Sequence, residues 1–194
     1  RKLQHFQFDY MPLWYAAVYI ASAKDMSSEM IPMEVIGVRV EMPSNQPIIL
    51  LREIDGTRFL PIWVGAVEAT AIAFAQQGLE PPRPLTHDLM AQLFEKFDAS
   101  LVAVHINELR DGVFYSTLQM RDSLANLVQL SARPSDAVAL ALRVNCPIFV
   151  SDDLLELVGK IIGQDVAVEQ DNENEIIDEF KDFIENVSPE DFFD

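Results

Sequence analysis

The sequence predicts an α+β protein in which one β3α2 unit occurs twice. The stretch WVGAVEATAIAFA at 63–75 is echoed 68 positions later by SARPSDAVALALR at 131–143. Glu68 then falls on Asp136, and alternate alanines of the two stretches coincide. Each copy therefore places an acidic residue at the start of an alanine-rich helix.

The match extends upstream of the helices. VIGVRVE at 35–41 aligns with LVAVHIN at 101–107 at an offset of 66. We therefore expect copies over about 33–97 and 100–159, related by two-fold pseudo-symmetry and sharing one core.

The first copy is expected to form three strands followed by two helices. β-Branched residues favour the strands, and Asp55-Gly56 is a hairpin signal. Gly78 ends the first helix, and Thr86 is expected to cap the second after a rigid PPRP linker. The predicted strands are 33–42, 47–54 and 58–64, and the predicted helices are 66–77 and 86–97.

The second copy repeats that order, with Asp111-Gly112 at its first hairpin. We expect Ser135 to cap one helix and Ser151 to cap another that ends at Gly159. The predicted strands are 100–109, 113–121 and 126–131, followed by a helix over 136–144 and an extended piece over 147–150.

The two ends differ from this repeated part. Residues 1–29 are expected to be a non-native or poorly ordered extension, because Arg1 is not a start residue and the apolar run Met11–Ala23 is too short to span a bilayer. Residues 164–194 form an acidic tail with an apolar stripe at helical spacing over 174–187. That helix is expected to pack on its own domain, and the alternative is a partner-docking or autoinhibitory tail.

Composition excludes several classes. The formal charge of −17 includes a net −11 over residues 165–194, so no basic platform for tight nucleic-acid binding is present. The single Cys146 rules out an intramolecular disulfide and favours a reducing compartment, which we take to be the cytoplasm, with no membrane association. No phosphate-binding glycine loop, no G-x-S-x-G and no H-E-x-x-H occurs.

Carboxylates at helix starts are the remaining candidates for chemistry. Glu68 and Asp136 each lie in a first helical turn, where the helix dipole alone stabilises a carboxylate by about 0.3–1 kcal/mol. Taken singly, each favours a capping role. Together, at equivalent positions of two copies, they could hold Mg²⁺ or Mn²⁺.

Other polar residues stand at the same helix entrances. His87 could act as a general base or metal ligand, or be structural, and Asp88 beside it could be catalytic or simply stabilise the helix start. Arg83 and Arg133 each precede a proline and could bind phosphate, or else pair with Asp or Glu. His105 alternates within a strand and is expected to be packed or on the surface.

LPIWVGAVEATAIAFAQQG, PRPLTHDLM, DGVFYSTL, ARPSDAVALALR and PIFVSDDLL, in this order and spacing, resemble the bifunctional nuclease (BFN) domain family. The resemblance covers about 33–159 and implies a nuclease domain over 30–163, with the duplicated unit forming one barrel-like sheet flanked by helices. It also implies a homo-oligomer that hydrolyses RNA and DNA. Ser131 and Val113 depart from the commonest motif, which carries Asp and Thr there.

These residues are compatible with two functions. The first is a metal-assisted nuclease with RNA or DNA as a transient substrate, in which Glu68, His87, Asp88 and Asp136 are catalytic. Glu68 and Asp136 would also bind Mg²⁺ or Mn²⁺, and Arg83 and Arg133 would bind substrate. The alternative is a non-catalytic homo-oligomeric binding or regulatory module, which the −17 charge and the acidic tail favour.

Overall fold

The computed structural model describes residues 29–41, 44–79 and 81–161. Expectations for the N-terminal extension and the acidic tail lie outside these residues. The strands are β1 (Met30–Glu41), β2 (Gln46–Glu53), β3 (Arg58–Trp63), β4 (Ser100–Arg110), β5 (Val113–Arg121), β6 (Leu127–Ala132), β7 (Ile148–Ser151) and β8 (Lys160–Ile161). The helices are α2 (Ala66–Gln76), α3 (Thr86–Lys96), α4 (Pro134–Val144) and α5 (Asp152–Val158). Within the described ranges, the α+β class and the predicted order of elements are confirmed, and the short β8 is the one element there that was not predicted.

One sheet contains all the described strands, in the order β6-β5-β4-β7-β1-β2-β3-β8. Neighbours pair antiparallel except β4 and β7, which are parallel. The pairing starts at β6 and ends at β8 without returning, so the described strands form an open sheet. The barrel-like sheet that the family resemblance implied is not confirmed.

The two halves of the chain have similar local architecture. Each begins with a three-stranded antiparallel meander followed by a helix: β1-β2-β3 with α2, and β4-β5-β6 with α4. They then differ, because the first half continues into α3 and the second into β7 and α5. Strand β7 is buried along its whole length and lies between β4 and β1, so it joins the two meanders. The ancestral duplication remains an interpretation of the sequence.

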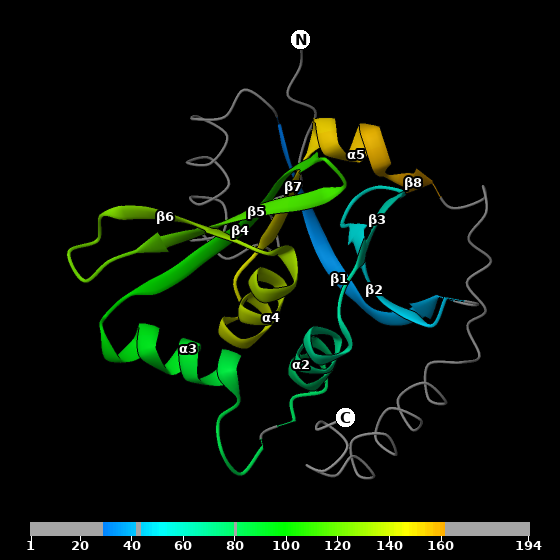
Figure 1. Ribbon diagram of the computed structural model, residues 1–194. Coiled ribbons are helices and arrows are strands. Elements are labelled where there is room, and N and C mark those ends of the chain that lie inside the picture. The colour runs from blue at the N-terminus through cyan, green and yellow to red at the C-terminus, as the bar shows by residue number, and fades with distance from the viewer. Residues whose placement is uncertain (1–28, 42–43, 80, 162–194) are drawn as a thin grey trace.

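Three helices gather together beside the sheet (Figure 1). Helix α2 contacts β1 and β2, α4 contacts β4 and β5, and both α2 and α3 contact α4. Side chains alternate between the two faces of the sheet, and the face beneath the helices is apolar, as Ile49 and Leu51 of β2 illustrate. Fully buried side chains from both halves meet in one core, among them Ile49, Leu51, Leu60, Ile72, Leu118 and Leu140. In the described ranges, no helix is long and apolar enough to cross a membrane.

Two predicted helix caps are wrong by one or two residues. Leu85, not Thr86, is the N-cap of α3, and the Asp88 carboxylate accepts a hydrogen bond from the Leu85 N–H at 2.8 Å. Arg133, not Ser135, is the N-cap of α4, because a proline at the first helical position already has the required φ and no N–H to satisfy. Ser151 does cap α5, where its hydroxyl accepts from the Leu154 N–H.

Candidate functional site

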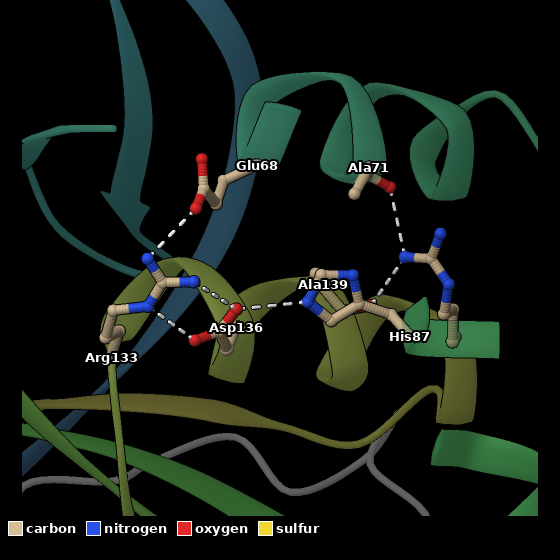
Figure 2. A network of polar contacts seen from close by, with 7 residues as sticks. Glu68, Ala71, His87, Arg133, Asp136 and Ala139 are labelled. Carbon is tan, nitrogen blue, oxygen red and sulfur yellow. Dashed lines mark hydrogen bonds and ion pairs between the residues drawn. The ribbon is translucent and has the colours of Figure 1, made fainter. Parts of the chain in front are cut away.

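The first turns of α2, α3 and α4 meet in one polar cluster, which consists of Glu68, His87, Arg133 and Asp136 (Figure 2). Glu68 lies in the first turn of α2, and Asp136 in the first turn of α4. His87 is the one buried residue of α3. Helix packing thus gathers side chains that are up to 68 positions apart in the sequence.

Arg133 is the centre of the cluster. Its Nε and Nη2 atoms donate to the two carboxylate oxygens of Asp136 at 2.7 and 3.0 Å. Its Nη1 atom lies 2.9 Å from Oε1 of Glu68. The guanidinium side chain remains 65% exposed, so it is open to anions from solution while it holds both carboxylates.

His87 completes the cluster from α3. Its Nε2 atom lies 3.2 Å from Oδ1 of Asp136. Burial opposes ionisation of Asp136, but hydrogen bonds from Arg133 and His87 outweigh it and hold the pKa of that carboxyl below its usual value. An ionised carboxylate only accepts hydrogen bonds, so the contact places the imidazole proton on Nε2 and leaves the Nδ1 lone pair as the basic one.

Asp88, another predicted site residue, makes a different set of contacts. One carboxylate oxygen accepts from the Leu85 N–H, and the other accepts a short hydrogen bond from Nε of Arg143. Burial raises the pKa of Asp88, and these bonds reverse the effect, so that the net shift is downward. Arg143 also donates through Nη1 to the carbonyl oxygens of Ala71 at 3.0 Å and Ala139 at 2.9 Å.

Arg143 was missed by the sequence analysis. A basic residue in the last turn of a helix is ordinarily explained by the helix dipole. The available signal was that the equivalent position of the first copy is the apolar Ala75. Only the tertiary contacts distinguish this arginine from an ordinary C-terminal one.

Other candidates lie apart from the polar cluster. Arg83 is exposed on the connection between α2 and α3 and takes part in none of the cluster's ion pairs. His105 is buried edge-on against Phe149, and burial lowers its pKa to about 4. Burial raises the pKa of the Cys146 thiol to about 12, which makes it a poor nucleophile at neutral pH.

The predicted metal ligands, Glu68 and Asp136, both lie in the polar cluster. In the part of the chain that the structure describes, no three His, Cys, Asp or Glu side chains are placed to hold a metal ion. The two predicted ligands, Glu68 and Asp136, both face the Arg133 guanidinium, which already supplies the compensating positive charge. The arrangement does not fit a bound divalent cation.

The chain belongs to the bifunctional nuclease domain family, whose pattern it matches over residues 49–162. All four residues of the polar cluster lie within the matched region. Two uncharacterised Mycobacterium tuberculosis proteins, from strains CDC 1551 and H37Rv, are each 47% identical over 166 residues, covering 82% of this chain and 96% of theirs.

A plant protein extends the comparison. Bifunctional nuclease 1 of Oryza sativa subsp. indica is 26% identical over 109 residues, which cover 55% of this chain and 33% of the rice protein. The rice protein is thus matched over only a third of its length. The comparison supports the nuclease family and identifies no catalytic residue.

Proposed function

We propose that this protein is a nuclease that hydrolyses phosphodiester bonds in RNA and DNA. The observation that carries the proposal is the meeting of a partly exposed arginine, an oriented imidazole and two carboxylates at three helix starts, within the region that matches the nuclease family. These are the residue types that phosphate recognition and proton transfer require.

Arg133 is proposed to bind the substrate phosphate. The Nε and Nη2 atoms of Arg133 already donate to Asp136, but the side chain is 65% exposed, so a phosphate oxygen would approach the same guanidinium from solution. Arg83, exposed on the neighbouring connection, is proposed to hold a more distant phosphate. Because Glu68 and Asp136 repel a polyanion, binding should be transient.

His87 is proposed to act as the general base. Its Nδ1 atom would take a proton from water while the water oxygen bonds to phosphorus, the bond to the leaving oxygen breaks, and that oxygen takes a proton from solvent. Asp136 would orient the imidazole and stabilise the imidazolium that forms. Glu68 would assist by holding the Arg133 guanidinium in place. Asp88, which directly follows His87 in α3, would contribute without touching the substrate.

Cleavage of single-stranded RNA and DNA by highly purified protein tests this proposal. His87→Gln and Asp136→Asn should each lower kcat by roughly 100-fold or more, the usual contribution of a positioned acid or base. Glu108→Gln is the matched control, because Glu108 also pairs with an arginine but lies on β4, outside the cluster. Activity that survives equally in all three variants would come from a contaminant and would overturn the proposal.

We further propose that the protein assembles as a homo-oligomer through β6. This strand ends the sheet, carries no charge and exposes Leu127, Val128 and Leu130. In a chain of charge −17, an uncharged edge is where two copies repel each other least, and antiparallel pairing of two such edges is self-complementary. The alternative function, a non-catalytic homo-oligomeric binding or regulatory module, would include the same assembly.

Solution mass by light scattering tests the assembly. Leu130→Lys places a charge on the edge strand and should shift the protein to monomer. Leu157→Lys, a matched change on the exposed face of α5, should leave the mass unchanged. A monomeric wild-type protein, or a mass unaffected by Leu130→Lys, would contradict assembly through β6.

A further inference from the structure

A second arginine, Arg143, connects the three helices that carry the polar cluster. Arg143 contacts the Ala71 carbonyl on α2, the Ala139 carbonyl on α4 and the Asp88 carboxylate on α3. Its side chain is only 9% exposed, whereas that of Arg133 is 65% exposed. The Arg133 guanidinium therefore joins α2 and α4 at the surface, and the Arg143 guanidinium joins α2, α3 and α4 in the interior.

The contacts of Arg143 are in register with the cluster. Ala71 lies three residues after Glu68, and Ala139 lies three residues after Asp136, so each carbonyl is about one turn further along the helix that carries a cluster carboxylate. On α3 the contacted residue is Asp88, directly after His87. Arg143 thus binds each helix close to the residue which that helix contributes.

Helix α3 needs this anchor more than the other two helices do. His87 is its one buried residue, and Met90 and Phe94 are only partly buried against the core. Leu89 and Leu93 of this helix remain exposed, as does its C-cap residue Phe97. Apolar packing therefore constrains the rotation of α3 weakly, and neighbouring helix positions point about 100° apart, so fixing Asp88 fixes the direction of His87.

We propose that Arg143 is a positioning residue of the nuclease site: through Asp88 it sets the rotation of α3 and so holds His87 Nε2 against Asp136. The proposal rests on the proposed function for its catalytic meaning. Its structural part, the dependence of the His87–Asp136 contact on Arg143, stands apart from activity. Asp88 is then the second member of the anchor, and neither residue touches substrate.

Imidazole ¹⁵N chemical shifts of the full chain test the structural part. The chain has three histidines, so the His87 signals can be assigned by their loss in His87→Gln. Wild-type His87 should show a protonated Nε2 and an unprotonated Nδ1. In Arg143→Lys, which keeps the charge but loses the planar fork, and in Asp88→Asn, the shifts should move toward a mixture of the two tautomers.

Arg58→Lys is the matched control. Arg58 also bridges two acidic residues, Glu53 and Asp152, at a partly buried position outside the polar cluster. It should leave the His87 signals unchanged. Unchanged His87 signals in both test variants would overturn the proposal, as would an equal change in the control, since that would indicate general loosening. If Arg143→Lys does not fold, Asp88→Asn decides by the same criterion.

Turnover supplies the second readout. In Arg143→Lys, kcat should fall roughly 100-fold, the effect expected of a small misplacement, while KM stays within about twofold because Arg133 still binds phosphate. A raised KM with unchanged kcat would overturn the proposal that Arg143 positions His87. If the wild-type protein cleaves nothing, the proposed function fails, and the ¹⁵N shifts still decide whether Arg143 positions His87.

Discussion

Glu68 and Asp136 share one guanidinium: Nη1 of Arg133 lies 2.9 Å from Glu68, and its Nε lies 2.7 Å from Asp136. The two carboxylates occupy equivalent positions in the two halves of the sequence. The position equivalent to Arg133 in the first half is Gly65, where an added Cβ would lie 2.4 Å from Oε2 of Glu68. A single arginine from the second half therefore serves both carboxylates, and the pseudo-symmetry of the sequence ends at this site.

The two arginines should differ in their contribution to stability. Arg133→Gln should lower the free energy of unfolding less than Arg143→Gln does, because the Arg133 side chain is 65% exposed whereas that of Arg143 is 9% exposed. Arg143→Gln should lower it by about 3 kcal/mol, because it leaves the Asp88 carboxylate poorly compensated in a mostly buried position. Urea unfolding measures both, and equal losses would contradict the assignment of Arg143 as the interior anchor.

Removing Arg133 should create a cation site. In Arg133→Gln, Glu68 and Asp136 lose their shared positive partner and become available as oxygen ligands. The affinity for Mn²⁺, measured by calorimetry or by electron paramagnetic resonance, should rise by about tenfold or more, which corresponds to about 1.4 kcal/mol.

The double variant Arg133→Gln with Glu68→Gln is the control for this gain and should lose it. A different result is that the wild-type protein binds Mn²⁺ tightly and that Glu68→Gln abolishes this binding. It would show that Arg133 moves away from the two carboxylates when the metal binds. That result would restore the metal-assisted mechanism that the sequence suggested.

His105 should make stability fall at mildly acidic pH. Its pKa is lowered by burial from 6.5 to about 4, so between these values the unfolded chain binds a proton that the folded chain does not. Its contribution is therefore complete above pH 6.5 and is lost as the pH falls toward 4. The loss should approach about 3 kcal/mol at 1.36 kcal/mol per pKa unit.

His105→Gln isolates this effect. The difference between the unfolding free energies of wild type and variant should change between pH 6.5 and 4 and remain constant above pH 7. Carboxylates with lowered pKa values, such as Asp88 and Asp136, titrate in both proteins and cancel. A difference that does not depend on pH would contradict the burial of an uncharged His105.

Ser151 should stabilise the junction of β7 and α5. Its hydroxyl donates to the Asn107 carbonyl at 2.6 Å and accepts from the Leu154 N–H at 3.3 Å. Ser151→Ala should cost about 1–2 kcal/mol, since it removes an N-cap and leaves the partly buried Asn107 carbonyl with one bond fewer. Ser151→Thr retains the hydroxyl and should cost less, as thermal or urea unfolding can measure.

The order of strands and helices was predictable because local signals agree with the tertiary environment. β-Branched runs, Asp-Gly hairpins and an alanine-rich helix stopped by Gly78 each specify one local conformation. The predicted N-caps Thr86 and Ser135 were wrong because the Asp88 side chain and Pro134 determine where the two helices begin. Leu85 uses the Asp88 carboxylate, and Pro134 moves the start of α4 back to Arg133.

The sequence by itself determined the elements, the family and the positions of Glu68 and Asp136 at two helix starts, because these depend on residues close together in the chain. Only the tertiary structure decided that Arg133 lies between those carboxylates, that His87 meets Asp136 and that Arg143 anchors Asp88. The pairs Glu68–Arg133, His87–Asp136 and Asp88–Arg143 join residues 65, 49 and 55 positions apart. They depend on how α2, α3 and α4 pack against one another. No local preference for helix or strand specifies a contact between residues so far apart in the sequence.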